Sequence, residues 1–221
     1  MEPIAHIFTD FDSKFGVPRQ SNLLSQLTAV VRFEPPYRSP EALRGIEGFD
    51  FLWLIWQFSA NVGRGWTPTV RPPRMGGNRR MGVFATRSPF RPNALGLSSV
   101  RLRAVEWDTP CGPELHVEGA DLMNGTPIFD IKPYIPYTDA HPDARAGFAA
   151  EPPGVALQVV CPPELSATLA PERWEALQQV LACDPRPAYH ADSDRVYGLG
   201  FAGHEVRFRV AGTVLTVVSI S

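Results

Sequence analysis

The sequence has little cysteine and no long apolar run, and each shortage excludes a class of protein. Its three cysteines, Cys111, Cys161 and Cys183, lie far apart and form no CxxC pair, so we expect neither a disulfide framework nor a metal site of the usual zinc spacing. The longest apolar stretch, Phe49 to Phe58, is interrupted by two polar residues and is too short to cross a bilayer. The N-terminus carries acids where a signal peptide needs bases. We therefore expect a cytoplasmic protein without a membrane partner or a metal.

Acidic residues are missing from one long window of the chain. From Phe51 to Val105 there is no Asp or Glu, although the net charge of the chain is −2. The basic residues of this window are all arginines: Arg64, Arg71, Arg74, Arg79, Arg80, Arg87, Arg91, Arg101 and Arg103. Guanidinium groups gathered without acids predict a surface that faces an anion.

Proline is abundant, with 23 residues, so the chain cannot be mostly helical. Between the prolines lie short apolar or alternating runs that we predict to be strands: His6–Thr9, Ala29–Phe33, Phe51–Phe58, Met81–Thr86, Ser98–Trp107, Glu114–Asp121 and Pro127–Ile131. Many short strands separated by turn residues favour a β-barrel or a β-sandwich.

The composition changes after Pro152-Pro153. A helix is predicted to begin at Pro171, because acids follow at its positive end and apolar residues share one face: Trp174, Leu177, Val180 and Leu181. From Val196 onward the pattern predicts two or three strands, with Ala211-Gly212 as a hairpin turn. We therefore predict a β-rich first domain, residues 1–148, and a small α+β second domain, residues 149–221.

Common catalytic signatures are absent from the sequence: there is no P-loop, HExxH, GxSxG or deaminase-type zinc motif. A formal GxGxxG occurs at Gly198, Gly200 and Gly203, but no helical pattern follows it. We interpret it as a glycine-rich β-turn and not as a dinucleotide site.

Three stretches stand out for their residue types. Pro68–Val100 presents arginines between prolines and glycines, as suits a clamp for phosphates or a carboxylate. Gly119–Tyr137 places two carboxylates and two tyrosines around an Asn-Gly turn, and such groups can bind an exocyclic amine and stack on a base. Phe15–Gln26 combines a turn with Arg19 and Gln20, and alone it carries little information.

Together these stretches resemble a known family. The matching segments are FGVPRQ at 15–20, YRSPEALRGIEGFDFLWLIW at 37–56, TVRPPRMGGNRRMGVFATRSPFRPNALGLSSV at 69–100, DLMNGTPIFDIKPYIPY at 121–137 and DPRPAY at 184–189. In their order and approximate spacing they look like the TrmO (TsaA-like) family, over nearly the whole chain. The resemblance implies a single-sheeted antiparallel β-barrel that binds S-adenosyl-L-methionine, a smaller C-terminal domain and a homodimer. It also implies the reaction, which is methyl transfer to N6 of threonylcarbamoyladenosine at nucleotide 37, next to the anticodon of threonine transfer RNA.

Carried over by position, the family's cofactor contacts fall on Pro18, Arg19, Gln20, Ser59, Ala60, Arg87, Leu97, Asp121, Leu122, Met123 and Asn124. Two positions depart from the family pattern. Ser59-Ala60 stands where relatives often have His-Gln, so a side-chain bond is lost or reduced. Asn124 stands where relatives often have Asp, which keeps the turn but removes one carboxylate.

The chemistry requires a proton to leave the acceptor N6, which is a poor nucleophile because it bears a carbamoyl group. We expect Asp121 or Asp130 to accept or orient this proton, with Lys132 and Tyr134 near the acceptor, and the sequence does not choose among them. The anticodon stem-loop backbone is expected to lie against Arg71, Arg74, Arg79, Arg80 and Arg91. In the second domain, Arg186 and Tyr189 are candidate RNA contacts.

Two other functions stay open at this point. A non-catalytic RNA-binding β-barrel would use the same arginines and tyrosines without a cofactor pocket. A methyltransferase of the same fold acting on a small molecule would not need the cluster of arginines.

Overall fold

The computed structural model describes residues 1–75, 79–151, 157–186 and 193–221, apart from the side chain of Arg74. Its strands are β1 (Ala5–Phe8), β2 (Thr28–Phe33), β3 (Phe51–Gln57), β4 (Thr69–Val70), β5 (Met81–Gly82), β6 (Leu95–Glu106), β7 (Glu114–Glu118), β8 (Thr126–Pro133), β9 (Gln158–Val160), β10 (Tyr197–Phe201), β11 (His204–Ala211) and β12 (Val214–Ile220). Its α-helices are α1 (Pro136–Asp139), α2 (Pro163–Ser166) and α3 (Pro171–Ala182). Short 3-10 helices are η1 (Pro35–Tyr37), η2 (Pro40–Leu43), η3 (Ile46–Gly48), η4 (Ser59–Asn61), η5 (Pro73–Met75), η6 (Val83–Ala85) and η7 (Gly147–Ala149).

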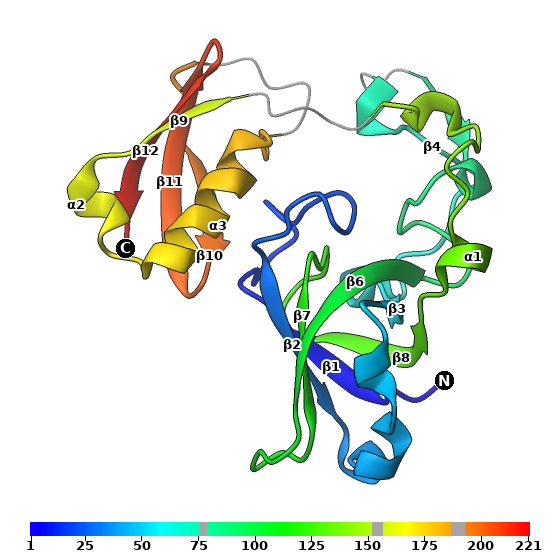
Figure 1. Cartoon of the computed structure of the whole chain (residues 1–221). Coiled ribbons are helices and arrows are strands. Elements are labelled where there is room, and N and C mark those ends of the chain that lie inside the picture. The colour runs from blue at the N-terminus through cyan, green and yellow to red at the C-terminus, as the bar shows by residue number, and fades with distance from the viewer. Residues whose placement is uncertain (76–78, 152–156, 187–192) are drawn as a thin grey trace.

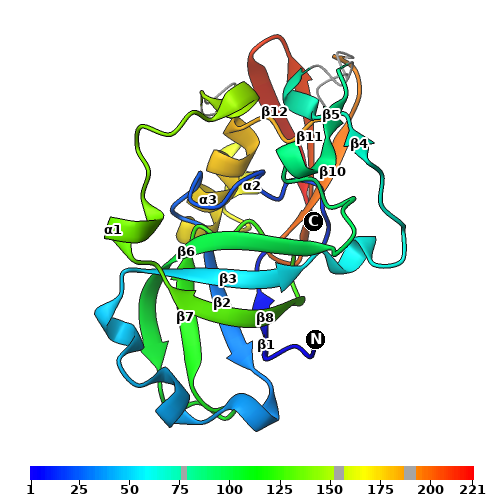
Figure 2. The same cartoon turned by 90° about the vertical axis from the view of Figure 1, so that its right-hand side faces the viewer.

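Six strands close into an antiparallel barrel in the order β1-β2-β7-β6-β3-β8 (Figures 1 and 2). Their alternating residues line its interior, as in β3, where Leu52, Leu54 and Trp56 are buried and the residues between them are partly exposed. A closed barrel satisfies the backbone of its strands without a long exposed edge. The predicted mainly β fold with a barrel is therefore confirmed.

One predicted strand is wrong. The run Met81–Thr86 forms only the two residues of β5, which pair with β4 in a separate ribbon, and then turns into η6. Val83 is buried whereas Phe84 and Ala85 are exposed, so the run lacks the alternation that would give a strand one buried face.

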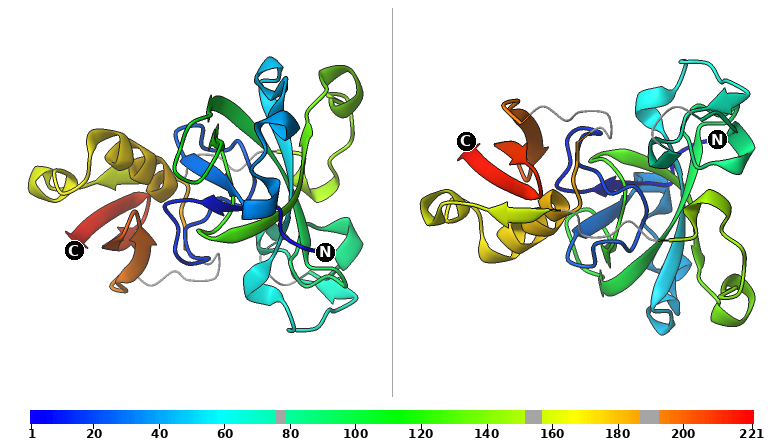
Figure 3. Two further views of the ribbon diagram at one scale, coloured as in Figure 1. Left: turned by 90° about the horizontal axis from the view of Figure 1, so that it is seen from below. Right: turned by 90° about the horizontal axis from the view of Figure 1, so that it is seen from above.

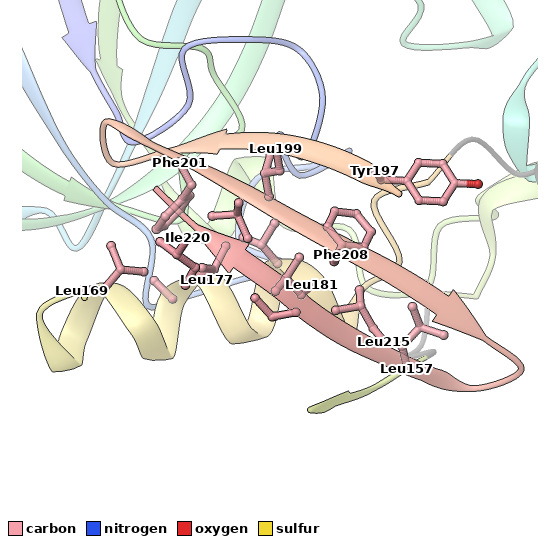
Figure 4. Packing of buried hydrophobic residues seen from close by; sticks show 14 of the residues in the cluster. Leu157, Leu169, Leu177, Leu181, Tyr197, Leu199, Phe201, Phe208, Leu215 and Ile220 are labelled. Atoms are coloured by element: carbon pink, nitrogen blue, oxygen red, sulfur yellow. The ribbon is translucent and has the colours of Figure 1, made fainter. Parts of the chain in front are cut away.

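The second sheet has the order β10-β11-β12-β9, with β9 parallel to β12. Figure 4 shows α3 packed on one face of this sheet, with Leu177 and Leu181 among Leu199, Phe201 and Phe208. The helix begins at Pro171 as predicted.

The GxGxxG run forms strand β10 and a two-residue turn, which confirms its interpretation as a glycine-rich β-turn. Phe201 pairs with His204, and the two turn residues Ala202 and Gly203 have φ of 51° and 79°, the left-handed backbone that such hairpins require. The hairpin between β11 and β12 turns at residues 212–213, because Ala211 pairs with Val214. It lies one residue later than predicted.

The long loop between β1 and β2, residues 9–27, lies between the barrel and the second sheet (Figures 1 and 3). Phe11, Leu24 and Leu27 of this loop are buried in the core of the second sheet. Asp10 forms an ion pair with Arg173 of α3, and its backbone carbonyl accepts a hydrogen bond of 2.8 Å from Ala202. The second core thus includes residues from the first part of the chain, and the division at residue 148 stays a prediction.

Among the described residues, no helix combines the length and the apolar character that a membrane span needs.

Candidate active site

The candidate site lies along the edge of β6, residues 95–100, where β7 does not pair with it. This strand pairs with β3 from Leu95 to Arg101, but with β7 only from Arg101 onward. The loop of residues 9–27 and the segment after β7 come to this edge instead. Asn22 donates from Nδ2 to the Ser99 carbonyl at 3.0 Å, and its backbone N–H donates to the Gly119 carbonyl at 2.8 Å.

A chain of three buried or partly buried side chains runs from the barrel interior to this edge. Trp56 Nε1 donates to Ser98 Oγ at 3.0 Å, and Ser98 Oγ donates to Asp121 Oδ1 at 2.5 Å. Ser98 can serve both neighbours because a hydroxyl accepts one hydrogen bond while it donates another. The chain fixes the orientation of the Asp121 carboxylate.

Burial raises the pKa of the Asp121 carboxyl above its usual range. The hydrogen bond from Ser98 and the positive charge of Arg87 lower this pKa, and each has a smaller effect than burial. Such a carboxylate is a stronger proton acceptor than an exposed one.

Arg87 and Gln20 lie on the same side of the molecule as Asp121. Arg87 donates from a terminal nitrogen to Gln20 Oε1, and its charge acts on Asp121. Three segments that are distant in sequence therefore supply a guanidinium, an amide and a carboxylate to one region. Arg19 lies on the same loop but its charge acts on Asp184 of the second part of the chain.

The turn after Asp121 is held by Asn124. Its backbone N–H donates to the Phe11 carbonyl at 2.7 Å, its Oδ1 accepts from the Thr9 N–H at 3.3 Å, and its Nδ2 donates to Asp12 Oδ1 at 3.1 Å. A carboxylate at position 124 would have no proton to donate and would face the Asp12 carboxylate. The departure at Asn124 thus suits the contact that this chain makes.

The other residues that the family resemblance assigns to the cofactor differ in their burial and in their place in the fold. Leu122 is buried in the barrel core and Met123 is partly buried, so the Leu122 side chain packs in the core and is not presented to a ligand. Ser59 and Ala60 begin η4. Leu97 is exposed on the outer face of β6, with its side chain opposite Ile55 of β3.

Asp130, Lys132 and Tyr134 form a separate cluster on the outer face of the barrel. Asp130 pairs with Lys132 at 2.9 Å, and the Tyr134 ring lies 5.5 Å from the Trp53 ring. Asp130 is in register with the outward-facing Ile55, whereas Ser98, the partner of Asp121, is in register with the buried Leu54. The structure therefore does not bring the two candidate proton acceptors together.

The arginines expected to bind RNA are not equivalent. Arg71, Arg79 and Arg80 are exposed, and Arg80 contacts Thr69 Oγ1 at 3.2 Å. Arg91 donates to the Thr86 and Ser88 carbonyls at 3.0 and 3.1 Å and so holds its own loop.

Of the other RNA candidates, only Arg186 has a described side chain. Arg186 is engaged by both carboxylate oxygens of Asp184, at 2.8 and 2.9 Å. The side chain of Arg74 and the whole of Tyr189 lie outside the described residues.

Sequence reasoning missed Ser98, Trp56, Asn22 and Asn61. A signal for Ser98 was present, because it alternates with Val100 on the side of the strand that faces the core. A hydroxyl at such a position needs a hydrogen-bond partner.

Two family models match most of the chain. Residues 6–140 match the tRNA-methyltransferase O N-terminal domain, and residues 155–221 match the TrmO C-terminal domain. A relative from Eikenella corrodens, named tRNA (adenine(37)-N6)-methyltransferase, is 52% identical over 73% of this chain and 91% of its own. A relative from Pseudomonas aeruginosa, named putative S-adenosylmethionine-dependent methyltransferase RcsF, is 41% identical over 90% of this chain and 87% of its own.

A solved structure matches the fold of this chain over its whole length. The crystal structure of TrmO from Pseudomonas aeruginosa is 32% identical to this chain, with a TM-score of 0.81, and the match covers 100% of this chain and 96% of that one. The chain therefore belongs to the tRNA-methyltransferase O (TrmO) family.

Proposed function

We propose that this protein is an S-adenosyl-L-methionine-dependent methyltransferase that acts on N6 of adenosine 37 in transfer RNA. The names of its relatives support this function, since one is named for that reaction and another for that cofactor. The observation that carries the proposal is the meeting of Gln20, Arg87 and Asp121 beside the edge of β6 where β7 does not pair with it. A mere RNA-binding barrel has no need for a buried carboxylate at such an edge.

The residues present fit the proposed cofactor, which carries two cationic groups, one carboxylate and a neutral nucleoside. Asp121 offers a carboxylate, Gln20 an amide and Arg87 a guanidinium, and the buried Nδ2 of Asn61 is a donor with no partner in the described structure. The residues that would hold the cofactor are Pro18, Arg19, Gln20, Ser59, Ala60, Arg87, Leu97, Asp121, Leu122, Met123 and Asn124. The cofactor supplies a methyl group bonded to a sulfonium sulfur.

The chain itself positions the acceptor and receives its proton. Holding the acceptor nitrogen in line with the transferred carbon, at about 3 to 3.5 Å, is the main task. Asp121, fixed by Ser98 and kept in a buried place, takes the N6 proton in its ionised form. Asp130 is the weaker candidate, because its charge is paired with Lys132 on the outer face.

The acceptor we propose is threonylcarbamoyladenosine in the anticodon stem-loop of threonine transfer RNA. The exposed Arg71, Arg79 and Arg80 would lie along its phosphates. Tyr134, beside Trp53 and Lys132, gives an aromatic and cationic surface on the outer face of the barrel, which suits contact with RNA bases or phosphates.

We further propose that the protein acts as a homodimer in the cytoplasm, where transfer RNA is. Large apolar side chains are exposed and available to a partner: Trp66 is 51% exposed, Phe84 74% and Tyr137 91%. Sedimentation of the purified chain tests the dimer directly.

The function is tested by mass analysis of anticodon-loop fragments of threonine transfer RNA after incubation with protein and labelled cofactor. We expect one added methyl on the hypermodified adenosine. Unlabelled fragments would reject the function. Equal turnover on small adenosine analogues would instead favour a small-molecule methyltransferase.

A further inference from the structure

A group of hydrogen-bond donors lies beside the proposed cofactor residues, and the acceptor that these donors would bind has not been assigned. Asn61 directly follows Ser59-Ala60 in η4, and Lys14 lies on the loop that leads to Pro18. Lys14 Nζ donates to Asn61 Oδ1 at 2.6 Å. The side chains of two segments distant in sequence are thus joined at this place.

Asn61 is only 6% exposed, and its Nδ2 has no hydrogen-bond partner among the residues that the structure describes. The orientation of the amide follows from Lys14, which has donors only and must therefore face the oxygen. The Nδ2 group then points away from Lys14 with both its protons free. Buried donors without partners are rare in native proteins, and they call for an acceptor that the protein alone does not provide.

Arg64 adds a second positive charge to the same place. Its backbone N–H donates to the Asn61 carbonyl at 3.2 Å. Burial and, to a smaller extent, the charge of Arg64 lower the pKa of Lys14, so the two cations lie near each other. In the described part of the chain, neither Lys14 nor Arg64 forms an ion pair with a carboxylate.

We propose that Lys14, Asn61 and Arg64 form a subsite for a carboxylate of the bound reactants. All three side chains offer protons, and the free amide group of Asn61 is buried, which favours a small acceptor at the end of a slender chain over a bulky one. A carboxylate meets this condition, whereas a phosphate of the RNA backbone carries a bulky ribose on each side. Charge-assisted hydrogen bonds from Lys14 and Arg64 would complete its binding.

The carboxylate has two possible sources, and the inference rests on the proposed function for both. One is the methionyl carboxylate of the cofactor, and the other is the threonyl carboxylate of the modified adenosine. In either case the subsite selects a reactant that carries a carboxylate over one that lacks it.

The test uses Asn61→Asp in the full chain. This substitution keeps the volume and the oxygen that Lys14 contacts, but it replaces both free donors by an acceptor. Arg44→Met is the matched control, because Arg44 is a 75% exposed arginine that pairs with Glu41 on η2. Calorimetry measures the binding of S-adenosyl-L-methionine and of its decarboxylated analogue. A binding titration compares transfer RNA with threonylcarbamoyladenosine and the same transfer RNA without the modification.

If the cofactor is the source, Asn61→Asp weakens S-adenosyl-L-methionine by tenfold or more and leaves the decarboxylated analogue unchanged. If the substrate is the source, cofactor affinity stays constant, and the preference of the wild type for the modified transfer RNA is lost. Arg44→Met behaves as the wild type in both arms. Should Asn61→Asp fail to fold, Lys14→Met and Arg64→Met are tested with the same probes.

The proposal is overturned if Asn61→Asp matches the wild type with every probe, or if it weakens both forms of the cofactor equally while the preference for the modified transfer RNA stays. A failure of the proposed function is recognised separately, because the wild-type protein itself would then neither bind the cofactor nor methylate transfer RNA, and the subsite would fall with it.

Discussion

Replacing Ser98 by alanine tests the chain of side chains that holds Asp121. Ser98 is 1% exposed, so water does not easily replace its hydroxyl. The variant removes the 2.5 Å bond to Asp121, and a hydrogen bond to a charged group is worth about 1.5 to 3 kcal/mol. One pKa unit corresponds to about 1.4 kcal/mol. We therefore expect the pKa of Asp121, already raised by burial, to rise further by about one to two units.

The assay is the pH dependence of methyl transfer to modified transfer RNA. In the proposed mechanism the ionised carboxylate of Asp121 accepts the proton, so we expect the rate to fall as the pH drops through the pKa of Asp121. The acid limb of the profile should shift to higher pH in Ser98→Ala. Ser99→Ala is the control, because the Ser99 hydroxyl accepts from Asn22 and does not contact Asp121. An acid limb in the same place for both folded variants and the wild type would refute the role of Ser98.

Further predictions concern stability and RNA binding. Gly96→Ala should lower the free energy of unfolding in urea by about 1 to 3 kcal/mol through overpacking, because the new Cβ would lie 2.2 Å from the Trp56 ring. Gly82→Ala is the control: its Cβ would meet open space, so this variant should unfold like the wild type. Burial raises the pKa of folded Asp121 above its unfolded value, so its contribution to stability is present at low pH and is lost as the pH rises through the folded pKa. Asp121→Asn should thus melt at a higher temperature than the wild type at neutral pH, with no gain in acid; a gain that grows in acid would contradict this. Replacing Arg79-Arg80 by alanines should reduce the slope of log affinity for transfer RNA against log salt by roughly 1.5 to 2, and an unchanged slope would place the phosphates elsewhere.

The barrel and the main helix follow from the sequence because they depend on local patterns. The apolar run that becomes β3 and the proline at the start of α3 are visible without coordinates. The run Met81–Thr86 was misleading, since its apolar residues do not share a face in the structure. A closed sheet needs only that each strand has one apolar side, so small errors at the ends of strands did not hide the fold.

The site depends on pairing between distant strands, which the sequence does not display. Asp121 and Asp130 flank the same turn, yet register places Asp130 outside the barrel and joins Asp121 to the inward-facing Ser98. The role of Asn124 likewise depends on Asp12, which is distant in sequence. Motif matching identified these positions, but only tertiary contacts separate the buried Asp121 carboxylate, bonded to Ser98, from the surface ion pair of Asp130 with Lys132.

The central claim is that Asp121, and not Asp130, takes the proton of the acceptor nitrogen. The most direct measurement is single-turnover methylation of modified transfer RNA by Asp121→Asn and Asp130→Asn, with cofactor affinity determined for each. We predict a rate loss of about 10² to 10⁴ for Asp121→Asn at saturating cofactor, and a rate near that of the wild type for Asp130→Asn. A full rate in Asp121→Asn, or the large loss in Asp130→Asn instead, would contradict the account.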